Sequence, residues 1–119
     1  MRYFAREGAI VAGCGRSARS VDTLRRELGA KHDFAAVDVA NAMAVDQWAA
    51  GVIERMGAPL LLLNNAAVIA RNAPLWEVPP EEIDAVLSVN LRGVINVLRG
   101  FLPAMISAKR GVIVNFSSG

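Results

Sequence analysis

Four consecutive leucines at positions 60–63 run directly into the sequence Asn64-Asn65-Ala66-Ala67. A short apolar run bounded by small and polar residues is typical of a strand that is buried on both faces of a parallel sheet. In such sheets, ligands bind where the strands end. The sequence therefore predicts a buried strand whose end places two side-chain amides at a ligand-binding edge.

The residues that follow this strand allow two interpretations. Asparagine closes turns readily because it bonds to nearby backbone and tolerates left-handed conformations. Alternatively, Asn65 offers both a donor and an acceptor to a ligand, and Ala66 and Ala67 are small enough to let a flat ligand approach the backbone. The local pattern alone leaves both interpretations open.

Length and composition restrict the class of protein. A chain of 119 residues fits one modest domain, so 1–119 is predicted to be a single one, and 54% hydrophobic residues indicate a substantial core. The formal net charge is only +2, with basic residues scattered along the chain, which argues against a nucleic-acid partner. No stretch approaches the roughly 20 apolar residues of a membrane span, so no membrane partner is predicted.

The single cysteine and the single histidine carry little functional signal. Cys14 excludes an intrachain disulfide and fits a reducing, cytoplasmic location. His32 has no neighbouring cysteine or second histidine, so no metal site is expected.

Apolar periodicity alternates between strand and helix along the chain. Strands are predicted at 9–14, 34–39, 60–63 and 112–116, and helices at 20–28, 44–56 and 81–108. The last helix starts at Pro79 and Pro80, which suit a first turn, and Pro103 is expected to kink it. This alternation predicts an α/β fold, a doubly wound parallel sheet of about four strands with helices on both faces.

Three polar features recur at strand ends or on an apolar helix: Asn64-Asn65, Asn90, and Ser117-Ser118. Each alone has an ordinary explanation, because asparagine and serine are common in turns and a mid-helix asparagine is often satisfied locally. Their order and spacing resemble the short-chain dehydrogenase/reductase family, whose pattern has Asn-Asn-Ala-Gly, then Val-Asn-Leu, then Asn-x-Ser-Ser. This chain differs in having Ala67 in place of the glycine, which puts the closeness of cofactor approach in doubt.

The resemblance covers essentially all 119 residues and implies a partial Rossmann-type domain. Residues 4–9 are similar to the end of the family's first helix, so the family's first strand and its glycine-rich loop are missing. The catalytic Tyr-x-x-x-Lys is missing too, because the sole tyrosine, Tyr3, is followed four residues later by Glu7. The chain is therefore interpreted as a fragment, with a sheet that has either a gap at its centre or an unnatural pairing.

The resemblance also implies roles for individual residues. Asp38 and Val39 would lie along the adenine ring, and the cofactor would contact Asn65, Ala66 and Ala67. Ser118 would orient the substrate's carbonyl or alcohol, with Ser117 as the fallback, and Asn90 would position water for a proton relay.

A competing interpretation comes from 13–18, Gly-Cys-Gly-Arg-Ser-Ala, which matches the dinucleotide-binding pattern G-x-G-x-x-G/A. Only two strands precede the leucine strand, however, where the family has three, so this segment is better assigned to the end of the second strand. The position where NAD-dependent relatives place an acid then holds Gly15, with Arg16 next to it, and a guanidinium can bind the additional phosphate of NADP. NADP is therefore predicted over NAD, unless Arg16 is an ordinary surface arginine.

Together these observations predict a fragment of an NAD(P)-dependent oxidoreductase that transfers hydride between a nicotinamide cofactor and a small carbonyl or alcohol substrate. The isolated chain is expected to be inactive. The family resemblance also implies a homo-oligomer formed through the helix at 81–108. The alternative is a non-catalytic dinucleotide-binding or assembly module.

Overall fold

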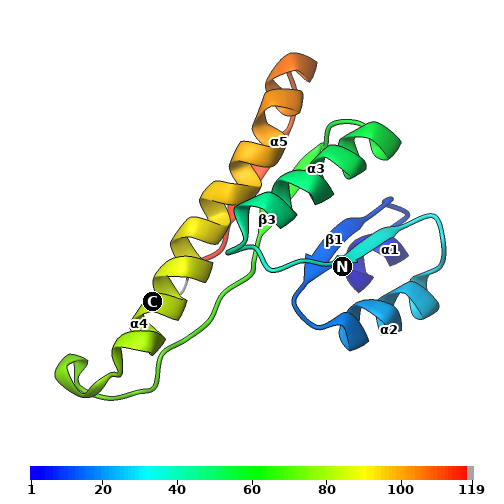
Figure 1. Cartoon of the computed structure of the whole chain (residues 1–119). Coiled ribbons are helices and arrows are strands. Elements are labelled where there is room, and N and C mark those ends of the chain that lie inside the picture. The colour runs from blue at the N-terminus through cyan, green and yellow to red at the C-terminus, as the bar shows by residue number, and fades with distance from the viewer. Residues whose placement is uncertain (118–119) are drawn as a thin grey trace. The chain divides into compact units, whose positions relative to one another are not determined.

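A computed structural model describes residues 1–117 of the chain (Figure 1). Its contacts divide into two compact units, Met1–Asp38 and Val39–Gly119, each of which has its own pair of parallel strands. The four strands thus form two separate pairs.

The first unit contains α1 (Arg2–Arg6), β1 (Ala12–Gly15), α2 (Ala18–Leu28) and β2 (Asp33–Ala36). β1 pairs with β2 in parallel, from Ala12 opposite Asp33 to Gly15 opposite Ala36. Helix α2 covers these strands and buries Val21 near Phe34. Its first turn is capped by Ser17, whose Oγ accepts a hydrogen bond from the Ser20 N–H at 3.2 Å.

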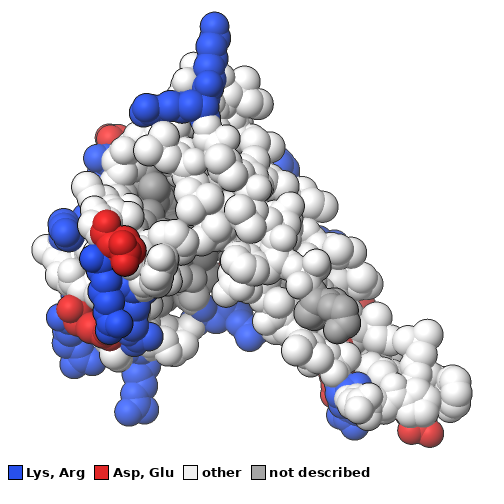
Figure 2. Space-filling view, turned by 180° about the vertical axis from the view of Figure 1, so that it is seen from behind, with Lys and Arg blue, Asp and Glu red and all other residues white. Residues whose placement is uncertain are grey.

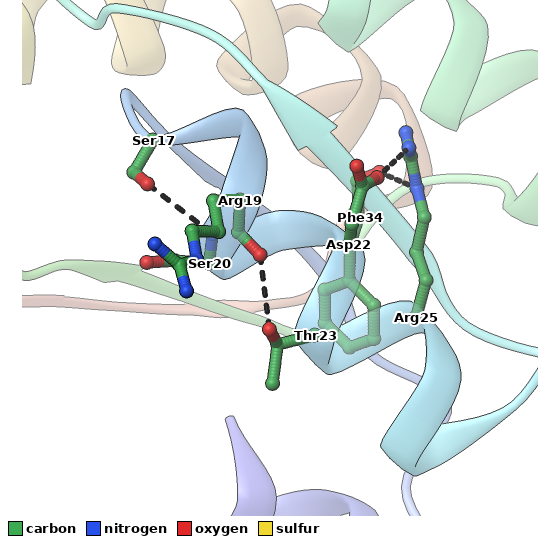
Figure 3. A network of polar contacts seen from close by, with 7 residues as sticks. All are labelled: Ser17, Arg19, Ser20, Asp22, Thr23, Arg25 and Phe34. Carbon is green, nitrogen blue, oxygen red and sulfur yellow. Dashed lines mark hydrogen bonds and ion pairs between the residues drawn. The ribbon is translucent and has the colours of Figure 1, made fainter.

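Two side chains attach the elements of this unit to one another. Arg25 Nε donates to the Phe34 carbonyl at 2.8 Å, which ties α2 to β2 (Figure 3). His32 Nδ1 accepts a hydrogen bond from the Val11 N–H at 3.0 Å, and its ring stacks on Phe34. His32 therefore serves the start of the strand pair, a structural role that its sequence context did not reveal.

The second unit contains α3, β3, η1, α4, η2, α5 and β4. Their bounds are α3 Ala42–Met56, β3 Leu61–Asn64, η1 Leu75–Glu77, α4 Pro80–Val86, η2 Leu87–Gly93, α5 Val94–Ala108 and β4 Val112–Asn115. β3 and β4 are parallel, from Leu61 opposite Val112 to Asn64 opposite Asn115.

The core of this unit lies where α3 runs along α5 (Figure 1). The rings of Trp48 and Phe101 meet edge to face, with centroids 5.3 Å apart. The helices approach closely beside them, because a Cβ built on Gly100 would lie 2.8 Å from the Ala49 Cβ. The glycine and the alanine therefore set the helix separation.

The long helix predicted at 81–108 is present, but it is not α-helical throughout. A π-helical segment, η2, separates α4 from α5. The helix thus departs from α geometry at Leu87–Gly93 and not at Pro103, where a kink was predicted, because α5 continues through Pro103. The π turn inserts one additional residue, which changes the direction in which later side chains point.

This run, Pro80–Ala108, spans 29 residues with an apolar window of mean hydropathy 1.3. By length and composition alone it is long enough to cross a membrane, so the expectation that no stretch approaches this length is wrong on that criterion. Core helices of soluble proteins meet the same criterion, and Val97, Phe101 and Met105 are buried in the fold. The absence of a membrane partner stays a prediction.

Replacing Gly100 by valine should overpack the contact between α3 and α5. We expect the free energy of unfolding to fall by about 1–3 kcal/mol, because the new side chain meets Ala49 within the core. Urea unfolding followed by circular dichroism measures the change. Ser107→Val, at an exposed position of the same helix, controls for helix propensity, and an equal loss in both variants would show that the close approach is not responsible.

Candidate cofactor site

The two strand-end asparagines after the leucines have different roles. Asn64 is only 8% exposed, and its Nδ2 donates to Asn115 Oδ1 at 2.8 Å, which joins the ends of β3 and β4. Asn65, Ala66 and Ala67 are exposed. The first amide is therefore structural, and the next three residues are the ones available to a ligand. The partnership with Asn115 was not predicted, although both asparagines end paired strands.

Asn90 lies inside η2 and is half-buried. Its Oδ1 accepts from the Val68 N–H at 2.9 Å, and its Nδ2 donates to the Val68 carbonyl at 2.9 Å. One amide thus satisfies both backbone groups of the residue that follows Ala67. The side chain of Asn90 is thus satisfied by a residue 22 positions away rather than within its own helical turn, and its part in a proton relay stays a prediction.

A second contact fixes the chain three residues further on. The carboxylate of Glu82, in the first turn of α4, accepts hydrogen bonds from Arg71 N at 3.1 Å, Arg71 Nε at 2.9 Å and Arg71 Nη2 at 2.6 Å. Arg71 also lowers the pKa of Glu82. The segment from Val68 to Arg71 is therefore anchored at both ends, although sequence reasoning assigned neither Arg71 nor Glu82 a role.

Val39 is held by the same helical run. Asn96 Nδ2 donates to the Val39 carbonyl at 2.8 Å, and a Cβ built on Gly93 would lie 2.6 Å from Val39 Cγ2. The strand β2 was predicted to end at residue 39 but ends at Ala36. Val39 therefore lies beyond the end of the strand.

In the first unit, Arg16 lies beside a cavity of about 180 Å³. The cavity is lined by Met1, Gly13, Cys14, Gly15, Arg16, Ser17, Ser20, Val21, Leu24 and Phe34. Arg16 and Asp38 are exposed. Burial raises the pKa of the Cys14 thiol to about 11, so the thiol stays protonated near neutral pH.

The two serines, the absence of a metal site and the distribution of charge were also predicted from the sequence. Ser118 lies outside the described residues, whereas Ser117 is described and exposed. Within 1–117, no group of three or more His, Cys, Asp or Glu side chains is placed to hold a metal ion. Lys and Arg on the face shown in Figure 2 are dispersed, several of them next to acidic side chains.

The short chain dehydrogenase family model matches residues 1–119. The chain therefore belongs to the short-chain dehydrogenase/reductase family, and the predicted family and α/β fold class are confirmed.

Individual relatives agree with the assignment. An NADPH-dependent pterin aldehyde reductase from Arabidopsis thaliana is 40% identical over 97% of this chain and 48% of its own length. A metagenomic short-chain oxidoreductase solved with NADP is 36% identical, with a TM-score of 0.88 over 99% of this chain and 54% of its own. An NAD⁺-bound xylitol dehydrogenase is 28% identical, with a TM-score of 0.87 over 96% and 45%. The chain thus spans about half the length of these proteins.

Replacing Asn90 by leucine should release the loop that follows Ala67. The variant leaves the Val68 N–H and carbonyl without their partners, so we expect the free energy of unfolding to fall by about 1–3 kcal/mol and the Val68 amide to exchange faster. Hydrogen exchange and urea unfolding measure the two effects. The control Asn65→Leu, at an exposed position, should change stability by less than about 0.5 kcal/mol. Unchanged exchange at Val68 would contradict the assignment.

Proposed function

We propose that this chain provides the cofactor-binding part of an NADP-dependent oxidoreductase that interconverts a carbonyl and an alcohol. The main support for the proposal is the exposure of residues 65–67 and the hydrogen bonds on either side of them. These residues are exposed after β3, in which only Leu62 and Asn64 are buried, and the side chains of Asn64 and Asn90 make hydrogen bonds on either side of the block. The family match over the whole chain supports the same conclusion.

In this proposal, bound NADP(H) supplies or accepts the hydride. Asn65 offers an amide to the cofactor, and the absence of a bulky side chain at Ala66 and Ala67 lets its ring approach the backbone. Asp38 and Val39 border the adenine. A ketone that accepts hydride also needs a proton donor and hydrogen bonds to its developing alkoxide, and Ser118 and Asn90 are assigned to orienting the substrate oxygen and the relay water.

The preference for NADP rests on Arg16. Of the similar proteins, one is solved with NADP and another with NAD⁺, so the similarity alone leaves the choice open. Arg16 is exposed beside a cavity at the start of α2, where a guanidinium can bind a phosphate with two hydrogen bonds and an acid would repel it.

Assembly into a homo-oligomer through 81–108 is part of the proposal. Leu87, Leu91 and Ile95 recur at every fourth position of the run and are 49%, 59% and 55% exposed. Such an apolar row suits packing against another helix. The same row favours the second candidate, a non-catalytic assembly module. A small-molecule substrate, the absence of nucleic-acid and membrane partners, and a cytoplasmic location stay predictions.

Carbonyl-dependent oxidation of NADPH tests the proposed activity. The purified 119-residue chain should neither bind NADP tightly nor turn over, because it contains no Tyr-x-x-x-Lys. The same residues expressed with any coding sequence that flanks them in the genome should turn over if it supplies Thr-Gly-x-x-x-Gly-x-Gly upstream and Tyr-x-x-x-Lys downstream. Turnover by the chain alone would refute the expected inactivity, and flanks without these motifs would favour the assembly module.

Reversing the charge of Arg16 tests the cofactor preference. Arg16→Glu should weaken binding of 2′,5′-ADP by roughly 10- to 100-fold, since charge-assisted hydrogen bonds to phosphate are lost, and should leave 5′-AMP little changed. Titrations followed by NMR at millimolar nucleotide measure both. Arg26→Glu, at an exposed arginine in the last turn of α2, the helix that follows Arg16, makes the same change in net charge. An equal effect of the two variants would remove the basis for preferring NADP.

A further inference from the structure

Asn96 is a buried polar residue to which the proposed chemistry assigns no task. It lies in α5 and is 4% exposed. Its Nδ2 donates to the Val39 carbonyl at 2.8 Å, across 57 positions of the sequence. A buried amide of this kind requires a partner, and its partner is the backbone of a residue predicted to border the adenine ring.

This contact does not serve to start the neighbouring helix. The first turn of α3 has its own cap, because Asn41 Oδ1 accepts a hydrogen bond from the Ala44 N–H at 3.1 Å. The bond from Asn96 is therefore additional, and it acts on the chain two residues before that cap.

Gly93, three residues before Asn96, lies close to the side chain of Val39. A Cβ at this position would lie 2.6 Å from Val39 Cγ2 and 3.2 Å from Val39 Cβ. The Val39 side chain is 8% exposed, so it packs within the fold, and a methyl group at position 93 would displace it. Helix η2 and helix α5 thus fix Val39 at both its carbonyl and its side chain.

We propose that Asn96, together with Gly93, is a positioning residue that fixes Val39 for the adenine half of the cofactor. The inference rests on the proposed function, because it takes Val39 to be an adenine contact. The residues 90, 93 and 96 recur at every third position, and the first of them holds Val68 next to the other predicted cofactor segment. One helical run therefore sets the backbone of both segments.

Amide exchange in this chain tests the positioning itself, without any cofactor. Asn96→Leu removes the donor and keeps an apolar side chain of similar size, so we expect amides at 39–41 to exchange about 10-fold faster or more, relative to α5 core amides at Val97 and Phe101. Gln47→Leu, the loss of an exposed amide on α3, should leave this ratio unchanged. An unchanged ratio in Asn96→Leu would overturn the proposal.

Nucleotide fragments separate positioning from general stability. Asn96→Leu should weaken binding of 2′,5′-ADP about 10-fold and leave nicotinamide mononucleotide unchanged, measured by NMR titration. Equal weakening of both fragments would indicate a merely structural residue and would overturn the proposal.

Gly93→Ala provides a second variant if Asn96→Leu does not fold. Alanine favours the helix but displaces Val39, so the chain should fold and show the same selective loss for 2′,5′-ADP. Wild-type affinity for 2′,5′-ADP in this variant would count against the proposal. If the unmodified chain shows no shift at Val39 with 2′,5′-ADP, the adenine assignment in the proposed function fails, while the exchange ratio still decides whether Asn96 positions Val39.

Discussion

Backbone groups that leave a strand lose the partners that the ladder gave them, and buried ones must find others. In this protein side-chain amides provide such partners beside two segments that we propose contact the cofactor. Asn90 satisfies both backbone groups of Val68, Asn96 satisfies the Val39 carbonyl, and Asn64 joins Asn115 across the strand ends. Asparagine suits this task because one short side chain both donates and accepts.

The helical run from Pro80 to Ala108 is where two of these amides originate, and its geometry explains why it contains a π segment. In a regular α-helix each residue advances by about 100°, so one inserted residue rotates everything after it relative to everything before it. η2 makes this adjustment between α4, whose Glu82 anchors Arg71, and α5, which packs against α3. The same helical run therefore binds the loop at Arg71 near its start and packs in the core against α3 near its end.

Much of the fold could be predicted because it is locally encoded. The leucine strand and the alternation of helices and strands follow from patterns only a few residues long. The expected burial of that strand on both faces is wrong in this structure, because Leu60 and Leu61 are 60% and 41% exposed. The partners of Asn64, Asn90 and Asn96 could not be predicted in this way, because each contact joins residues 22 to 57 positions apart. The π segment was also missed, since an insertion of one residue barely disturbs apolar spacing.

The residues predicted to contact the cofactor are found in both units of the chain. Arg16 and its cavity belong to Met1–Asp38, whereas Asn65, Asn90 and the amides that hold Val39 and Val68 belong to Val39–Gly119. A substitution of Arg16 changes the charge after β1 and removes none of the hydrogen bonds that hold Val39 and Val68. Under the proposed function, the preference between NADP and NAD can therefore change without a change in these amides.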